Sequence, residues 1–162
     1  MSGDGSELIG DVLDRYAVED VCDLTTTGRR SGRAHTVEIW FAAHQRSLFI
    51  IGDPSLPDWY RNVVAATAAA GATGESVAMG SAVEVRLGDE HFVGTAAAIT
   101  DAARRRLAGR LLVSKYRSWL SAADVAEPGE DADGGGRPTS WAYGGAAIEI
   151  SGLEPRDRRV HP

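Results

Sequence analysis

Residues 24–41 read LTTTGRRSGRAHTVEIWF, which is two strand-forming runs on either side of a turn with a glycine at each end. The first run, from Val21 to Thr27, is rich in β-branched residues, which favour strands. The second run, from Thr36 to Phe41, alternates apolar and polar side chains with the period of a half-buried strand. This stretch predicts a β-hairpin whose turn carries three arginines.

Helices and further strands are expected on both sides of this hairpin. Helical spacing and capping residues predict helices at Ser6–Tyr16, from Asp58 onward and at Asp101–Leu120. Apolar and alternating runs predict strands at Ser47–Ile51, Ala82–Leu87, His91–Ile99 and Ala146–Ile150. This order predicts an α+β fold in which about six mainly antiparallel strands close into a small barrel with three helices packed around it.

The length of 162 residues fits one domain, so residues 1–162 are expected to form a single unit. Within it, residues 1–19 are interpreted as an N-terminal helical extension. Residues 121–138 are acidic and glycine-rich, cannot build a core, and are expected to form a loop.

Several classes of protein are disfavoured by composition. A net charge of −6 argues against a nucleic-acid partner, and no apolar run is long enough for an integral membrane segment. Cys22 is the sole cysteine and the four histidines lack ligand spacing, so neither a disulfide framework nor a metal site is expected. The acidic N-terminus carries no signal-type stretch, which favours a cytoplasmic location.

The turn itself has the chemistry of an anion site. Arg29, Arg30 and Arg33 fall within five residues, and the Ser31 hydroxyl and the backbone N–H groups add further donors. The alternative is an ordinary arginine-rich turn that faces water. The spacing excludes a P-loop, and a following strand rather than a helix excludes a dinucleotide-binding fingerprint. Without a nucleophile elbow or paired carboxylates, the chemistry is expected to come from a bound cofactor.

LTTTGRRSGR, followed by HTVEIWF and later by DWYRN at residues 58–62, resembles the deazaflavin-dependent nitroreductase family. These flavin/deazaflavin oxidoreductases have a split β-barrel, and the resemblance spans Val21 to Val63 with looser continuation beyond. It implies an enzyme that uses reduced coenzyme F-420, a 5-deazaflavin with a phosphodiester and an oligoglutamate tail. A hydride would pass between this cofactor and an electron-poor enone, quinone or nitro compound.

The resemblance also implies site residues. The cofactor-binding positions are Thr27, Arg29, Arg30, Ser31, Gly32, Arg33, Ile51, Gly52, Asp53, Asp58, Trp59 and Asn62. Trp40 and Trp119 are expected to line the substrate pocket, and Tyr60 and Tyr116 are the candidate catalytic proton donors.

The segment that follows the third expected strand departs from the family pattern. It is short, and Asp53 within it would oppose an anionic cofactor. Two alternatives therefore stay open: an oxidoreductase of the same barrel that binds FMN, and a non-catalytic module that holds a cofactor or small anion. A small-molecule substrate is the expected partner, and a homodimer is left open.

Overall fold

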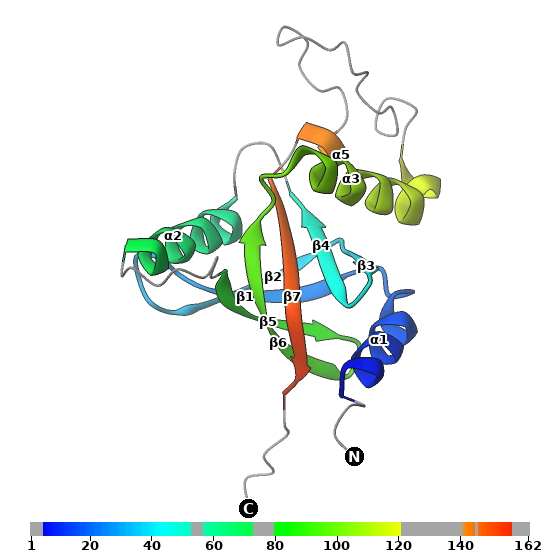
Figure 1. Cartoon of the computed structure of the whole chain (residues 1–162), viewed down its shortest axis with the longest axis horizontal. Coiled ribbons are helices and arrows are strands. Elements are labelled where there is room, and N and C mark those ends of the chain that lie inside the picture. The colour runs from blue at the N-terminus through cyan, green and yellow to red at the C-terminus, as the bar shows by residue number, and fades with distance from the viewer. Residues whose placement is uncertain (1–4, 53–56, 73–79, 121–140, 145, 157–162) are drawn as a thin grey trace, which may run out of the picture.

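The computed structural model describes residues 5–52, 57–72, 80–120, 141–144 and 146–156 (Figure 1). The helices are α1 (Gly5–Tyr16), α2 (Asp58–Ala72), α3 (Ala102–Tyr116) and α5 (Trp141–Gly144), with a 3-10 turn η1 (Arg117–Trp119). The strands are β1 (Cys22–Thr27), β2 (Ala34–Ile39), β3 (Ala42–His44), β4 (Ser47–Ile51), β5 (Ser81–Leu87), β6 (Glu90–Ala98) and β7 (Ala147–Pro155). The acidic segment 121–138 and Asp53 lie outside the described residues, and the single-domain organisation stays a prediction.

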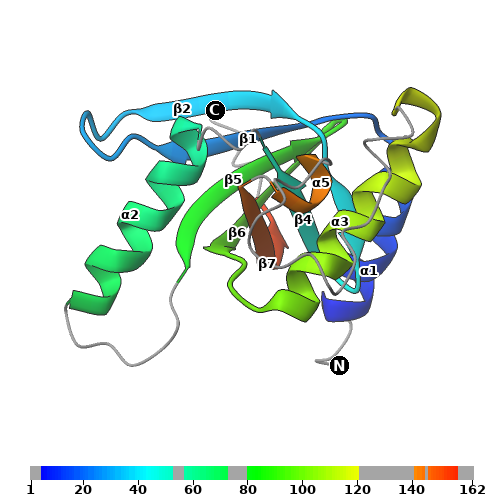
Figure 2. The same cartoon turned by 90° about the horizontal axis from the view of Figure 1, so that it is seen from above.

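The strands in the described ranges form one antiparallel sheet in the order β2-β1-β5-β6-β7-β4-β3. β2 and β3 lie at opposite edges of this sheet, although Trp40 and Phe41 alone separate them along the chain. The sheet therefore has to curl until its two edges meet, and Figure 2 shows this curvature. The predicted α+β split barrel is confirmed, with seven strands in the described ranges rather than about six.

The additional strand is β3, because the strand predicted from Thr36 to Phe41 ends early. β2 stops at Ile39, and Trp40 and Phe41 form the corner that carries the chain to the other edge. Phe41 is 0% exposed at this corner. Its apolar side chain continues the period-2 pattern of the strand, so the pattern cannot mark where the strand stops.

β4 is buried along its whole length because it is covered on both faces. Leu48 and Ile50 belong to the core inside the barrel. Phe49 and Ile51 belong to a second cluster that includes Leu112 of α3. This two-sided burial accounts for the uninterrupted apolar run from Leu48 to Ile51.

The helices cover different parts of the barrel. α2 contacts β1, β5 and β6, whereas α3 contacts β3 and β4. In Figure 2, α2 lies on one side of the barrel, and α1 and α3 lie on the other. α2, which was expected from Asp58 onward, runs to Ala72. α3 begins after Asp101, whose carboxylate accepts from the Arg104 N–H, and gives way to η1 before the predicted end.

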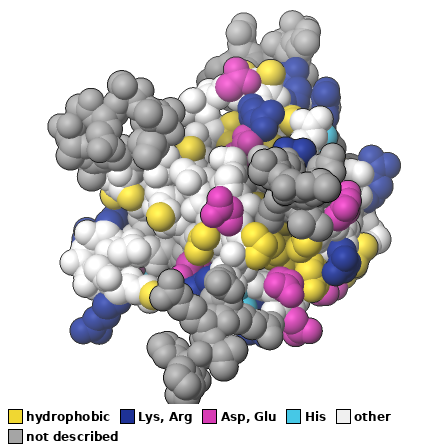
Figure 3. All heavy atoms as spheres, turned by 60° about the horizontal axis from the view of Figure 1, so that its bottom comes forward, with side chains coloured by type: hydrophobic (Ala, Val, Ile, Leu, Met, Phe, Trp, Pro, Cys, Tyr) yellow, Lys and Arg dark blue, Asp and Glu magenta, His cyan; other side chains and the backbone are white. Residues whose placement is uncertain are grey.

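The surface carries charges of both signs. On the face seen in Figure 3, acidic and basic side chains are interspersed rather than separated. That face is unlike the single basic surface with which proteins bind nucleic acids. None of the described helices has the length and apolar character needed to cross a membrane.

Candidate functional site

The turn between β1 and β2 is closed by its own backbone. The Gly28 N–H donates to the Arg33 carbonyl oxygen (2.8 Å), and the Gly32 N–H donates to the Gly28 carbonyl oxygen (2.9 Å). Gly32 has a φ of +69°, a conformation that glycine adopts without steric cost. The Ser31 hydroxyl accepts from the Arg33 N–H at 3.2 Å. The glycines of the motif therefore fix a compact turn.

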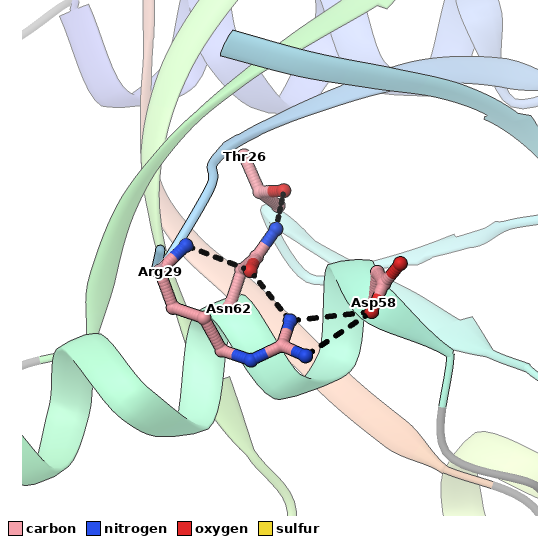
Figure 4. Close-up of polar contacts among 4 residues, drawn as sticks. All are labelled: Thr26, Arg29, Asp58 and Asn62. Atoms are coloured by element: carbon pink, nitrogen blue, oxygen red, sulfur yellow. Dashed lines mark hydrogen bonds and ion pairs between the residues drawn. The ribbon is translucent and has the colours of Figure 1, made fainter. Parts of the chain in front are cut away.

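Asn62 ties this turn to α2, as Figure 4 shows. Its Oδ1 accepts from the Arg29 backbone N–H (3.0 Å) and from the Arg29 Nη1 (3.1 Å). Its Nδ2 donates to the Thr26 hydroxyl oxygen at 3.0 Å. Asn62 is 4% exposed and Thr26 is 1% exposed. Loss of these hydrogen bonds would leave buried polar groups without water as a partner, which costs free energy. The Asn62 amide thus sets the position of the turn against the helix.

Arg29 is also ion-paired. Its Nη1 and Nη2 donate to Asp58 Oδ1 at 3.2 and 3.3 Å. The Arg29 side chain is 23% exposed, and the Asp58 side chain is 67% exposed. Much of the Arg29 charge is therefore already balanced within the protein.

A pocket of about 400 Å³ opens between the turn and α2. This arginine pocket is lined by Gly28, Arg29, Arg30, Ser31, Arg33, Ala34, His35, Asp58 and Asn62. Among these described residues three arginines face one aspartate, so positive charge is in excess. Within the described ranges, neither Arg30 nor Arg33 has a side-chain hydrogen bond or ion pair. These two exposed cations are the groups best placed to bind an anion.

The pocket brings together half of the predicted cofactor-binding residues. Those that line it are Arg29, Arg30, Ser31, Arg33, Asp58 and Asn62. Thr27 and Gly32 lie beside it in the hairpin, exposed to solvent. The sequence prediction missed three lining residues: Gly28, which begins the turn, and Ala34 and His35, which follow it directly on β2. The spacing of the histidines was used only to judge whether they could bind a metal, and nothing in the sequence by itself places His35 in this pocket.

The other predicted cofactor residues in the described ranges are packed inside the fold. Trp59 is 4% exposed within the barrel core. Gly52 lies directly against the Trp59 ring, because a Cβ on Gly52 would clash with the ring carbon Cζ2. Ile51 is 3% exposed in the cluster under α3. These contacts give all three residues a packing role, and their contact with a cofactor stays a prediction.

Trp40, Tyr116 and Trp119 form an aromatic cluster where β2 meets the end of α3. The Trp40 and Tyr116 rings are stacked, with centroids 4.2 Å apart and planes 9° apart. Trp119 lies 5.8 Å from Trp40 and 6.0 Å from Tyr116, between ring centroids. Trp119 is 57% exposed, so the cluster presents an aromatic surface to solvent.

The hydroxyl of Tyr116 is held by the main chain at the corner that follows β2. It accepts from the Phe41 N–H (3.0 Å) and lies 2.7 Å from the Asp20 carbonyl oxygen, to which it donates. Burial raises the pKa of Tyr116 to about 12. Lys115 Nζ donates to the Phe41 carbonyl oxygen at 2.9 Å, and burial lowers the pKa of Lys115 to about 8. This geometry favours a structural role for Tyr116, and its predicted role in proton donation gains no support from it.

Replacing Tyr116 with phenylalanine is expected to lower the free energy of unfolding by about 1–3 kcal/mol, because the buried Phe41 N–H loses its acceptor. Urea unfolding followed by circular dichroism measures this loss. Tyr16→Phe is the matched control, since Tyr16 is half-buried and packs against the core through its ring. Equal stability of the Tyr116→Phe and wild-type proteins would contradict the structural role.

Tyr60, the other predicted proton donor, is half-buried on α2. Its ring meets Trp59 edge-on, with centroids 6.1 Å apart and planes 89° apart. Tyr60 packs against the barrel core and does not line the arginine pocket. Its catalytic role therefore stays a prediction.

A second pocket, of about 290 Å³, lies beside the start of α3. Arg104 binds Glu149 through two hydrogen bonds of 2.6 and 2.7 Å, and the Ser47 hydroxyl donates to the same carboxylate at 2.9 Å. The hydrogen bonds from Arg104 hold the pKa of Glu149 below its usual range. Because these charges cancel, this pocket lacks the positive excess of the arginine pocket. Among the residues described, no group of His, Cys, Asp and Glu side chains is arranged to hold a metal.

Sequence comparison gives one family match. The family model for F420H(2)-dependent quinone reductases matches residues 6–124. No curated protein matches the sequence.

Solved structures of similar fold cover most of the chain. A conserved hypothetical protein from Mycobacterium tuberculosis has a TM-score of 0.58 at 12% identity, covering 93% of this chain and 84% of the other. A candidate pyridoxamine 5'-phosphate oxidase from Listeria innocua has a TM-score of 0.53 at 15% identity, covering 93% and 94%. An F420-H2 dependent reductase has a TM-score of 0.50 at 17% identity, covering 82% and 95%. At these identities the likeness shows the fold alone.

Proposed function

Because the chain belongs to the family of F420H(2)-dependent quinone reductases and is therefore an F420-dependent oxidoreductase, we propose that it reduces an electron-poor small molecule. The substrate class is a quinone, an enone or a nitro compound, each of which can accept a hydride. When bound, reduced F420 supplies that hydride. The protein's own residues bind the two molecules, orient them and exclude water.

The observation that carries this proposal is the arginine pocket. The phosphodiester and the carboxylates of F420 are the anions that arginine binds through charge-assisted hydrogen bonds. Arg30 and Arg33 would hold these groups, with the Ser31 hydroxyl as a further donor. The donor set and its excess positive charge fit the anionic end of the cofactor.

The aromatic cluster is the substrate surface in this proposal. Trp40 follows the end of β2, whereas the arginine pocket lies at the strand's start. Four strand residues lie between His35 of the pocket and Trp40, which places the Cα atoms of these two roughly 16 Å apart at about 3.3 Å per residue. Trp119 and Trp40 would bind a planar substrate by stacking. Ile51 is buried and Gly52 is half-buried, so this segment would meet the cofactor ring through its main chain rather than through a side chain.

Removing the exposed ring of Trp119 is expected to raise KM for a quinone by roughly threefold to tenfold, since aromatic pairs contribute about 0.5–1.5 kcal/mol beyond burial. The affinity for F420 should stay within about twofold of wild type, because Trp119 does not line the arginine pocket. Steady-state kinetics with Trp119→Ala measures both effects, and Trp119→Phe, which keeps a ring, is the control. An unchanged KM would remove Trp119 from the substrate surface.

Of the two predicted proton donors, Tyr60 is the one kept in this proposal, since the Tyr116 hydroxyl is held by main-chain groups. Tyr60→Phe should then lower kcat with a quinone while the affinity for F420 is retained. Equal kcat values for the variant and the wild type would leave solvent as the proton source.

The test of the proposed function is a titration of the purified protein with oxidised F420 and, separately, with FMN at two salt concentrations. We expect F420 to bind, FMN to bind more weakly, and F420 binding to weaken as salt screens the arginines. Reduced F420 should then be consumed with quinones, enones or nitroaromatics. Preference for FMN would favour the flavin alternative, and F420 binding without turnover of any substrate would favour a non-catalytic module.

Neither the fold nor the site tests the predictions on oligomeric state and cellular location. A homodimer and the location inferred from the N-terminal sequence stay predictions. Sedimentation of the purified chain would measure its oligomeric state directly.

A further inference from the structure

Asp58 is the one acidic residue among the described residues that line the arginine pocket. Its Oδ1 binds both terminal nitrogens of Arg29, at 3.2 and 3.3 Å, and its side chain is 67% exposed. Figure 4 shows the carboxylate against the outer end of the guanidinium. A carboxylate here occupies the position that an anionic oxygen of a ligand would take on Arg29.

The two partners of Arg29 differ in how firmly they are held. Asn62 is 4% exposed, is bonded to Thr26, and binds both the backbone N–H and the Nη1 of Arg29. Asp58 holds Arg29 through an exposed ion pair, and such pairs contribute little to stability. A ligand can therefore displace Asp58 while Asn62 keeps the guanidinium in place.

Arg29 can thus bind a ligand only when the Asp58 carboxylate is displaced. Arg30 and Arg33 are exposed and have no side-chain ion pair within the described ranges. Arg29 is pre-positioned by Asn62 but already paired. The first anionic group of a ligand would meet the two unpaired arginines, and a further group would reach Arg29 by replacing the Asp58 carboxylate.

We propose that Asp58 is a specificity-determining residue of this site, which holds Arg29 in an exchangeable ion pair and so sets how many anionic groups a ligand needs to engage all three arginines. The inference rests on the proposed function, because it concerns the pocket assigned to the F420 tail. Ligands with several anionic groups bind at all three arginines, and ligands with one bind at Arg30 and Arg33 alone.

The test measures affinities by isothermal titration calorimetry for wild type and Asp58→Asn. The probes are F420 with short and with long oligoglutamate tails, and inorganic pyrophosphate and phosphate. Asp58→Asn should bind the long-tailed F420 and pyrophosphate about threefold to fivefold more tightly at low salt, with a smaller gain for phosphate. The gain should shrink as salt rises.

A double-mutant cycle separates the exchange from simple charge repulsion. In an Arg29→Met background, which keeps the backbone N–H bonded to Asn62, Asp58→Asn should give no gain. A gain of equal size in that background would overturn the proposal, as would no gain in the wild-type background. Glu154→Gln, which removes one exposed carboxylate on β7 outside the pocket, is the control for net charge.

The outcomes distinguish this inference from the proposed function. If the wild type binds pyrophosphate but not F420, the proposed function fails, and the cycle with pyrophosphate still decides the role of Asp58. If F420 binds and Asp58→Asn has no effect, the inference alone fails. Asp58→Ser is a second variant that removes the carboxylate, and thermal unfolding checks that both variants are folded.

Discussion

Replacing Arg30 and Arg33 together with alanine is expected to weaken F420 binding about 100-fold or more while the fold is retained. Each arginine offers a charge-assisted contact of about 1.5–3 kcal/mol, and 1.4 kcal/mol corresponds to about tenfold in affinity. Both side chains are exposed and unpaired within the described ranges, so their removal breaks no described hydrogen bond. Fluorescence titration of oxidised F420 measures the affinity, and thermal unfolding measures the stability.

The control for this double variant has to remove the same charge elsewhere. Arg61 on α2 and Arg117 in η1 are exposed and do not line the arginine pocket. Alanine at both of these positions should weaken F420 binding less than about threefold, through the long-range field alone. Equal losses in the two double variants, or retained binding in Arg30→Ala/Arg33→Ala, would show that the pocket is not the anion site.

Arg29 should behave differently from its two neighbours in the turn. Arg29→Ala removes the bonds from the guanidinium to Asn62 and Asp58, which join the turn to α2. We therefore expect a loss of stability as well as of affinity, whereas Arg30 and Arg33 affect affinity alone. The sequence places three equivalent cations in one turn, and the structure separates them by their partners.

The location of the arginine pocket could be predicted from the sequence because the residues that form its turn are neighbours in the chain. The glycines of GRRSG set the turn within five residues, and Gly32 takes the left-handed conformation that the turn needs. The link through Asn62 could not be predicted from the residues by themselves, since Asn62 and Arg29 are 33 positions apart and meet when α2 packs against the barrel. The resemblance to a family implied Asn62 as a site residue, and the structure shows that its side chain joins the turn to the helix.

The fold prediction likewise succeeded where neighbouring residues determine the structure and failed where distant residues do. Strand β4 was predicted with correct bounds, because an apolar run bounded by turn residues is a local signal. The corner at Trp40 and Phe41 was missed, since the chain turns there to reach a distant edge of the sheet. The contacts that hold this corner come from Tyr116 and Lys115, more than 70 positions away.

Trp59→Ala is expected to lower the free energy of unfolding by about 3–5 kcal/mol, which is the usual cost of removing a large aromatic side chain from a core. Trp59 is 4% exposed and belongs to the cluster that fills the barrel. Chemical denaturation measures the loss, and Trp119→Ala, which removes an exposed ring of the same kind, should cost less than about 1 kcal/mol. A stable Trp59→Ala variant that no longer binds F420 would instead assign Trp59 to the cofactor.

Gly52 provides an independent measure of the same contact. A Cβ at this position would clash with the Trp59 ring, so Gly52→Ala should also destabilise the protein, even though alanine is ordinarily no worse than glycine in a folded chain. Replacing Trp59 with the smaller leucine opens the space that the new methyl group needs. The loss in Gly52→Ala/Trp59→Leu should therefore be smaller than the sum of the two single losses, because the residues share one contact. Additive losses would mean that the Gly52→Ala variant relaxes elsewhere. The Trp59 ring would then not be the reason that glycine follows β4.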